Sequence, residues 1–163
     1  MENFEKIIDS FELRNSLNPK IWDNSQNTED AKLKPKVRKA LINISEEFAE
    51  YLGGDFFIED VVLTGSLSNF NWSPYSDFDL HLIVDFKQFE NEAELKIENF
   101  NLKKQIFNEK HNIKIYGYDV ELYAQDESES HFASGVYSIM NDEWVTIPKR
   151  EDFTLDRPLF KRR

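Results

Sequence analysis

The chain has 163 residues, enough for one domain with a proper core, and 14% of its residues are aromatic. It contains no cysteine, which excludes disulfides and thiolate metal sites and fits a reducing compartment. Acidic residues outnumber basic ones by 31 to 20, so the net charge of −11 argues against nonspecific nucleic-acid binding. No basic leader and no apolar run of membrane-spanning length is present, so we expect a cytoplasmic protein and no membrane contact.

The first third of the chain predicts two helices separated by a loop. Apolar residues recur at helical spacing over residues 3–14, which predicts a short amphipathic helix, and the polar stretch 15–32 predicts a loop. A second helix is expected over 34–52, with Pro35 in its first turn and Gly53 after its end.

The remainder predicts strands interrupted by one long helix. The expected elements are a strand over 56–63, a short helix over 66–71, a strand over 77–84, a helix over 87–110, strands over 113–116 and 118–124, and a hairpin of 135–140 with 144–147. This order predicts an α+β fold with one mixed sheet and helices against one face. We expect a single domain with a core of about 34–147, an N-terminal helix and loop over 1–33, and a tail over 148–163.

Two short motifs carry the chemistry. Gly65 and Ser66 form a turn after one predicted strand, and Asp77 and Asp79 stand at the head of the next. Side chains alternate along a strand, so both carboxylates point to one face, roughly 6 to 7 Å apart, away from the apolar side chains. Carboxylates held side by side repel each other, which a divalent cation between them relieves. The motifs together predict a metal site beside a phosphate-binding turn.

The turn residues suit an anion. Gly65 has no Cβ, so the backbone can approach a triphosphate closely, and Ser66 offers a hydroxyl at the start of a predicted helix. Ser76, directly before Asp77, either orients or caps the loop. His81 lies on the same face as Asp79, where it contacts substrate, holds an acid by a hydrogen bond, or is a structural histidine.

This arrangement resembles the signature of the DNA polymerase beta-like nucleotidyltransferase superfamily. That signature is Gly followed by Gly or Ser, a spacer of about a dozen residues, and Asp, apolar residue, Asp or Glu, apolar residue. The surroundings of the motifs, together with residues 131–148, also resemble small nucleotidyltransferases of tailed phages. The family carries a third acid on a later strand, which matches Glu121; Asp119, on the same strand face, is the rival for this place.

The resemblance implies a two-metal-ion nucleotidyltransferase that uses Mg²⁺ or Mn²⁺. Asp77, Asp79 and Glu121 would be its catalytic and metal-binding acids, and Gly65, Ser66 and Ser76 would bind a nucleoside triphosphate such as ATP. The acceptor hydroxyl would belong to a small molecule, a protein or an RNA end. The short chain leaves little room for an accessory acceptor-binding domain, so we expect either a compact enzyme or one assisted by a protein partner or by a second copy.

A second hypothesis is a noncatalytic regulatory or toxin-neutralising interaction protein on the same scaffold. Retention of both Asp77 and Asp79 favours the enzyme over this alternative.

Overall fold

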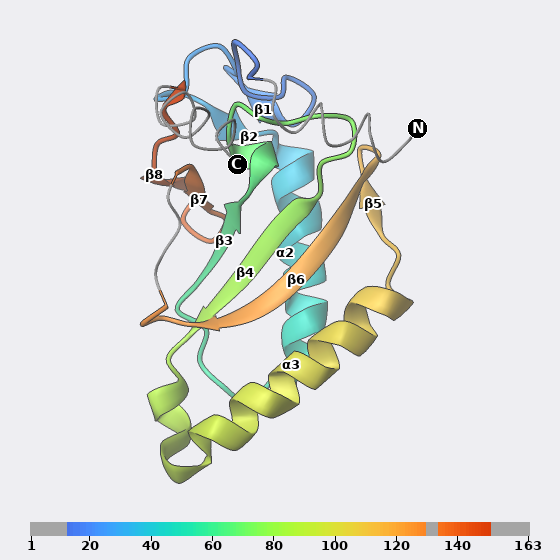
Figure 1. Cartoon of the computed structure of the whole chain (residues 1–163), viewed down its shortest axis with the longest axis vertical. Coiled ribbons are helices and arrows are strands. Elements are labelled where there is room, and N and C mark those ends of the chain that lie inside the picture. Colours follow the sequence, from blue (N-terminus) through green and yellow to red (C-terminus); the bar gives the residue numbers. More distant parts are fainter. Residues whose placement is uncertain (1–12, 130–133, 151–163) are drawn as a thin grey trace, which may run out of the picture.

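The computed structural model describes residues 13–129 and 134–150. Within them the chain is a mixed α+β protein with a curled six-stranded sheet, two α-helices and a small two-stranded sheet (Figure 1). The helix expected over 3–14 falls almost wholly outside the described residues, as does most of the tail. In the described part of the chain, no helix is long and apolar enough to cross a bilayer.

The large sheet has the strand order β5-β6-β4-β3-β7-β8. Its strands are β3 (Asp60–Thr64), β4 (Phe78–Val84), β5 (Lys114–Ile115), β6 (Tyr118–Asp126), β7 (Val136–Ser138) and β8 (Glu143–Thr146). β4 and β6 are parallel, whereas the other neighbours in this sheet run antiparallel. The predicted hairpin of β7 and β8 is confirmed, and the two strands predicted on either side of Gly117 pair as β5 and β6.

Two long helices cover one face of this sheet. α2 (Pro35–Tyr51) begins with proline, which needs no amide hydrogen-bond acceptor there, and ends where Gly53 and Gly54 adopt positive φ. α3 (Ala93–Lys110) follows the 3₁₀ segment η2 (Phe86–Glu92) in the connection from β4 to β6. In Figure 1, α2 lies behind the sheet and α3 runs beside β6.

The core lies between the sheet and the helices. Buried positions alternate along all of β4, as expected of a strand with one covered face. Phe48 of α2 packs against Phe107 of α3 with ring centroids 5.1 Å apart, and Phe100 of α3 packs against Phe86 at 5.6 Å. The opposite face of β4 carries Asp79 and His81, so the sheet separates its apolar side from its polar side.

The N-terminal loop contributes to this core more than its polar sequence suggests. Ile21 and Trp22 are almost completely buried, and the two-residue strands β1 (Trp22–Asp23) and β2 (Lys32–Leu33) pair with each other. Trp22 stacks on Trp144 at 4.7 Å and donates its indole N–H to the Leu67 carbonyl at 2.7 Å. The loop is therefore fixed beside the segment that follows β3.

Two of the longer predicted elements also differ from the structure. The strand predicted over 56–63 is confirmed only from Asp60 onward, since Phe57 is 69% exposed and its amide binds the Gln88 side chain. The helix predicted over 87–110 is interrupted at Glu90, whose φ of 53° is incompatible with a helix. Apolar spacing continues through this break, which is why periodicity alone did not reveal it.

Candidate functional site

Two of the three predicted acids lie side by side on neighbouring strands. Asp79 of β4 pairs in register with Glu121 of β6, and parallel strands lie about 4.8 Å apart. Asp77 immediately precedes β4, two residues from Asp79. The pKa of the Tyr123 hydroxyl is raised, first by burial and then by the hydrogen bond to Glu121. The negative charges of Glu121, Asp79 and Asp77 raise this pKa further. All three acids are thus close enough for their charges to affect the Tyr123 hydroxyl, which stays protonated and acts as a hydrogen-bond donor.

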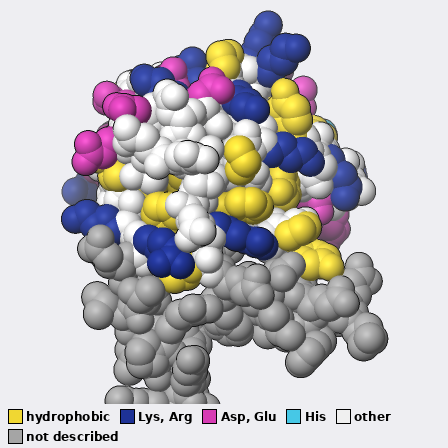
Figure 2. All heavy atoms as spheres, turned by 90° about the horizontal axis from the view of Figure 1, so that it is seen from above, with side chains coloured by type: hydrophobic (Ala, Val, Ile, Leu, Met, Phe, Trp, Pro, Cys, Tyr) yellow, Lys and Arg dark blue, Asp and Glu magenta, His cyan; other side chains and the backbone are white. Residues whose placement is uncertain are grey.

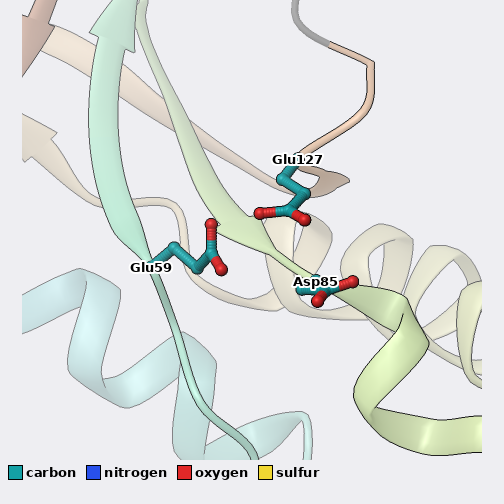
Figure 3. Close-up of side chains that lie close together, drawn as sticks. All are labelled: Glu59, Asp85 and Glu127. Carbon is teal, nitrogen blue, oxygen red and sulfur yellow. The ribbon is translucent and has the colours of Figure 1, made fainter.

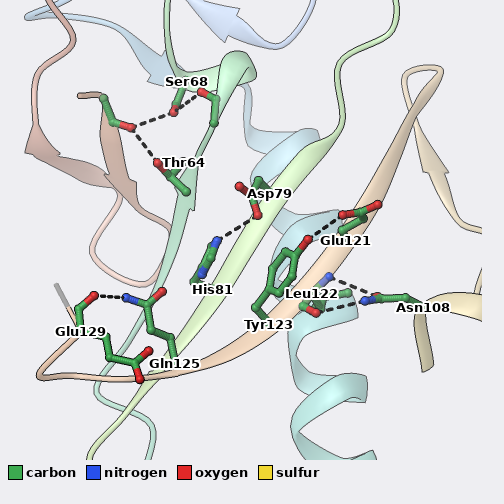
Figure 4. A network of polar contacts seen from close by, with 12 residues as sticks. Thr64, Ser68, Asp79, His81, Asn108, Glu121, Leu122, Tyr123, Gln125 and Glu129 are labelled. Carbon is green, nitrogen blue, oxygen red and sulfur yellow. Dashed lines mark hydrogen bonds and ion pairs between the residues drawn. The ribbon is translucent and has the colours of Figure 1, made fainter. Parts of the chain in front are cut away.

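Each of the paired acids is held by the residue two positions further along its own strand (Figure 4). His81 Nε2 lies 2.9 Å from Asp79 Oδ1, and the Tyr123 hydroxyl donates to Glu121 Oε2 at 2.7 Å. The two rings also pair in register and stack with centroids 4.8 Å apart at 20°. The result is a connected patch on the sheet face opposite α2. The sequence left three roles open for His81, and the structure shows its contact with an acid; the role of Tyr123 was missed.

Gly65 lies directly against Asp79. Its φ of 81° favours glycine, and a Cβ built on it would lie 3.2 Å from Asp79 Cβ and 3.3 Å from Asp79 Oδ2. The pairing of Thr64 with Asp79 across β3 and β4 places the turn there. The short helix predicted after the turn is only the 3₁₀ segment η1 (Ser66–Ser68), so a helix dipole contributes little at this point.

Ser66 of the turn and Ser76 of the loop before Asp77, both predicted to bind nucleotide, contact each other. Ser66 Oγ donates to Ser76 Oγ at 2.7 Å, and Ser76 Oγ accepts from the Ser73 amide at 2.9 Å. Ser76 therefore closes the loop before Asp77 and ties it to the turn after β3. The three predicted nucleotide-binding residues form one rim beside Asp79.

Ser68, Asn69 and Gly135 hold this turn in place through hydrogen bonds that the sequence did not reveal. We call these three residues the clamp. The buried Asn69 donates to the Gly65 carbonyl at 2.7 Å and accepts from the Gly135 amide at 2.9 Å. Ser68 Oγ donates to the Gly135 carbonyl at 2.8 Å (Figure 4). Asparagine is common in loops, so only its burial in the structure identifies this role.

The Gly65→Ala variant is expected to unfold at lower urea concentration than the wild type and to bind nucleotide more weakly. Positive φ costs a non-glycine residue about 1–2 kcal/mol, and the new methyl group would push Asp79 aside. Gly53→Ala is the matched control, since Gly53 also has positive φ but a Cβ there meets nothing within 4 Å. Equal stability losses and unchanged nucleotide affinity would show that the turn is only structural.

The predicted acids do not form the tightest acidic group in the described part of the chain. Among described residues, the one group of three whose ligand oxygens all lie within 4.8 Å of one another is Glu59, Asp85 and Glu127 (Figure 3). These residues lie at the far ends of β3, β4 and β6. The Glu59 amide donates to the Ile83 carbonyl and the Glu127 amide to the Val84 carbonyl, which sets the three side by side. A group of exposed acids alone does not indicate a cation.

We expect the stability of the protein to fall as pH rises from about 4.5 to about 7. The hydrogen bond to Glu59 is the main cause that raises the pKa of Glu127 to about 7, followed by desolvation and by nearby negative charge, first that of Asp85. The folded state then holds a proton that the unfolded state releases, and this advantage disappears as pH rises through that window. Glu127→Gln should raise the melting temperature at pH 8 and have no effect near pH 4. An equal gain at both pH values would contradict the shared proton.

Asp119, the rival third acid, lies at the start of β6. Its carboxylate is 3.6 Å from Lys114 Nζ on β5, and the two residues pair in register. Extending the register of β4 and β6 by one residue sets Asp119 beside Asp77, as Glu121 lies beside Asp79. Asp119 therefore has a cation partner. Among the described residues, no Lys or Arg nitrogen lies within 4.0 Å of a carboxylate oxygen of Asp79 or Glu121.

In comparisons with known proteins, the chain matched no protein-family model, no curated protein and no solved structure. The geometry of the site is thus the basis for any functional assignment.

Proposed function

We propose that the protein is a metal-dependent nucleotidyltransferase, which transfers a nucleotidyl group from a nucleoside triphosphate to an acceptor hydroxyl and releases pyrophosphate. The observation that carries this proposal is the alignment of Asp79 with Glu121 across β4 and β6, with Gly65 packed against Asp79. A nucleotidyltransferase-like fold, with the sheet face as one wall of an open cleft, is part of the proposal.

The donor set fits a hard divalent cation. Mg²⁺ and Mn²⁺ prefer carboxylate oxygens, and the Asp79 side chain is 36% exposed while Glu121 is exposed. Asp77, Asp79 and Glu121 would hold the cation. When bound, such an ion stabilises the negative charge that develops on the transferring phosphoryl group.

The chain's own residues supply positioning. The rim of Gly65, Ser66 and Ser76 would receive the triphosphate, since it offers hydroxyl groups and a backbone unobstructed by a Cβ. His81 and Tyr123 orient the acids through their hydrogen bonds. Glu121 would accept the proton of the acceptor hydroxyl, because it lies on the side of the site away from Gly65.

The charge distribution favours an acceptor other than a long nucleic acid. On the face seen in Figure 2, Lys and Arg side chains are interspersed with hydrophobic and acidic ones rather than gathered in one basic patch. The net charge of −11 points the same way.

A noncatalytic interaction protein on this scaffold is the second candidate. It is favoured by one observation: one oxygen of Asp79 and one of Glu121 already have hydrogen-bond partners, His81 and Tyr123, without a cation. The enzyme remains the better candidate because partner-held carboxylates are also usual around metal sites.

The deciding experiment measures pyrophosphate release from the four ribonucleoside triphosphates with Mg²⁺ or Mn²⁺, alongside calorimetric nucleotide binding. We expect metal-dependent binding and turnover in the wild type and neither in the Asp77→Ala, Asp79→Ala double variant. A wild type that binds no nucleotide would remove the enzyme proposal and leave the interaction protein.

A further inference from the structure

A groove of about 510 Å³ lies between α3 and the outer edge of β6. Its volume falls within the roughly 300–1,000 Å³ typical of small-molecule sites. The lining comes from one face of α3 and from two site residues of β6: Asn101, Lys104, Gln105, Asn108, Glu109, Glu121 and Tyr123. The spacing of three and four residues along α3 explains why its five polar side chains share this face.

The groove lies on the opposite side of the acids from the Gly65 turn. In the sheet order, β3 with its turn is followed by β4 with Asp79, then β6 with Glu121, and the groove lies beyond. β5 pairs with Tyr118 and Asp119 of β6, so no strand of the described residues covers the edge of β6 near Glu121. The Asn108 side chain occupies the position that a neighbouring strand would take. It donates to the Leu122 carbonyl and accepts from the Leu122 amide, both at 3.1 Å.

We infer that this groove binds the acceptor, and that the acceptor is a small polyhydroxylated molecule without phosphate groups. The inference rests on the proposed function. A triphosphate on the Gly65 rim and an acceptor in the groove would approach the acids from opposite sides, as an in-line transfer requires. The acceptor oxygen forms a bond to the α-phosphorus, the bond to the bridging oxygen breaks, pyrophosphate leaves, and the hydroxyl proton passes to Glu121.

The charges around the groove disfavour a polyanionic acceptor. Among the described residues that line it, Lys104 is the single cation, whereas Glu109 and Glu121 are acidic. Binding of a nucleic-acid backbone requires several cations that neutralise phosphates. An RNA end would meet two carboxylates and one ammonium group in this groove.

The aromatic ring in the groove is also unavailable to a nucleobase. One contact of Tyr123 is the stacked ring of His81, at 4.8 Å and 20°, and another is Lys104 Nζ, 4.6 Å from the ring centroid. Proteins that bind single-stranded nucleic acid rely on bases stacking on open aromatic faces. The groove offers no such platform among its lining residues.

The remaining polar side chains of the groove can form hydrogen bonds with hydroxyl groups. The Asn108 amide is engaged by Leu122, which leaves the exposed side chains of Asn101 and Gln105. Each amide can both donate and accept hydrogen bonds, as a hydroxyl group does, and Lys104 adds further donors. Sugars and cyclitols present several such groups on a small frame.

The test measures pyrophosphate release by the full chain with Mg²⁺ and its preferred triphosphate. The added probes are D-glucose, maltose and myo-inositol, compared with an oligoribonucleotide bearing a free 3′ hydroxyl and a serine-containing peptide. We expect at least one polyol to raise the rate tenfold or more. Gln105→Ala and Asn101→Ala should each raise the KM for that polyol about tenfold without changing the KM for the triphosphate. Asn99→Ala, an exposed amide on α3 outside the groove, is the control and should change neither.

Calorimetry of triphosphate binding separates the two proposals. Binding of the triphosphate with stimulation only by the oligoribonucleotide or the peptide would overturn the polyol inference and leave the proposed function intact. Polyol stimulation with an unchanged KM in Gln105→Ala and Asn101→Ala would overturn the assignment to this groove. Absence of triphosphate binding would remove both.

Discussion

The Glu121→Gln variant is expected to lose roughly 10³-fold in metal-dependent pyrophosphate release while keeping its fold. Glutamine preserves the shape of the side chain and can still accept the hydrogen bond from Tyr123. It lacks the negative charge that stands in register with Asp79. Loss of about 4 kcal/mol of transition-state stabilisation, within the range attributed to metal-ion catalysis, gives this factor. Turnover at saturating triphosphate and the melting temperature are the two measurements.

Asp119→Asn is the matched control, because Asp119 lies on the same strand face two residues earlier. Its carboxylate lies beside Asp77 but already faces Lys114 Nζ at 3.6 Å, so we expect activity within about threefold of the wild type. The opposite outcome, with Asp119→Asn inactive and Glu121→Gln active, would assign the third acid to Asp119. Full activity in both variants would mean that β6 supplies no ligand.

Period-two alternation made the face of each acid predictable. In β4, apolar and polar residues alternate from Phe78 to Leu82, and burial alternates along the whole strand to Val84, with Ile83 as an apolar residue on the less buried face. That pattern placed Asp79 and His81 on one face before any coordinates. Alternation could not place Glu121 beside Asp79, because that contact depends on the parallel register of β4 and β6. A long connection through α3 separates these two strands in the sequence.

The acids at the two ends of the sheet correct a premise of the sequence reasoning. Clustered carboxylates were expected to require a cation. At one end, the hydrogen bond to Glu59 is instead the main cause that raises the pKa of Glu127 to about 7. At the other, Asp79 and Glu121 accept hydrogen bonds from His81 and Tyr123. Repulsion between neighbouring carboxylates can therefore be relieved by a cation, by protonation of one acid or by hydrogen-bond donors. The spacing of the acids in the sequence does not indicate which of the three applies.

The clamp beneath the turn was inaccessible to sequence reasoning for a different reason. Asn69 and Gly135 are 66 residues apart, and their hydrogen bond joins the segment after β3 to the residue before β7. The sequence around Gly135 predicts the first strand of the hairpin but indicates no contact with Ser68 or Asn69. Its function appears only when the backbone brings Ser68 and Asn69 against it.

Gly135→Ala is therefore expected to destabilise the protein more than any other glycine substitution among the described residues. A Cβ on Gly135 would lie 2.1 Å from the Ser68 carbonyl oxygen and 2.9 Å from Asn69 Oδ1. Backbone must move to relieve such a contact, so the free energy of unfolding should fall by about 3 kcal/mol, at the upper end of overpacking costs. Urea denaturation measures this loss. Gly54→Ala controls for the change to alanine, since its nearest contact is 3.8 Å away and its positive φ costs about 1 kcal/mol.

The same substitution tests whether the clamp serves the site. Asn69 links Gly135 to the Gly65 carbonyl, so a shift of Gly135 would move the turn that packs against Asp79. We expect Gly135→Ala to weaken triphosphate binding at temperatures where the variant is fully folded, whereas Gly54→Ala should leave it unchanged. A folded Gly135→Ala variant with wild-type nucleotide affinity would separate the clamp from the site, because the turn would then hold its position without it.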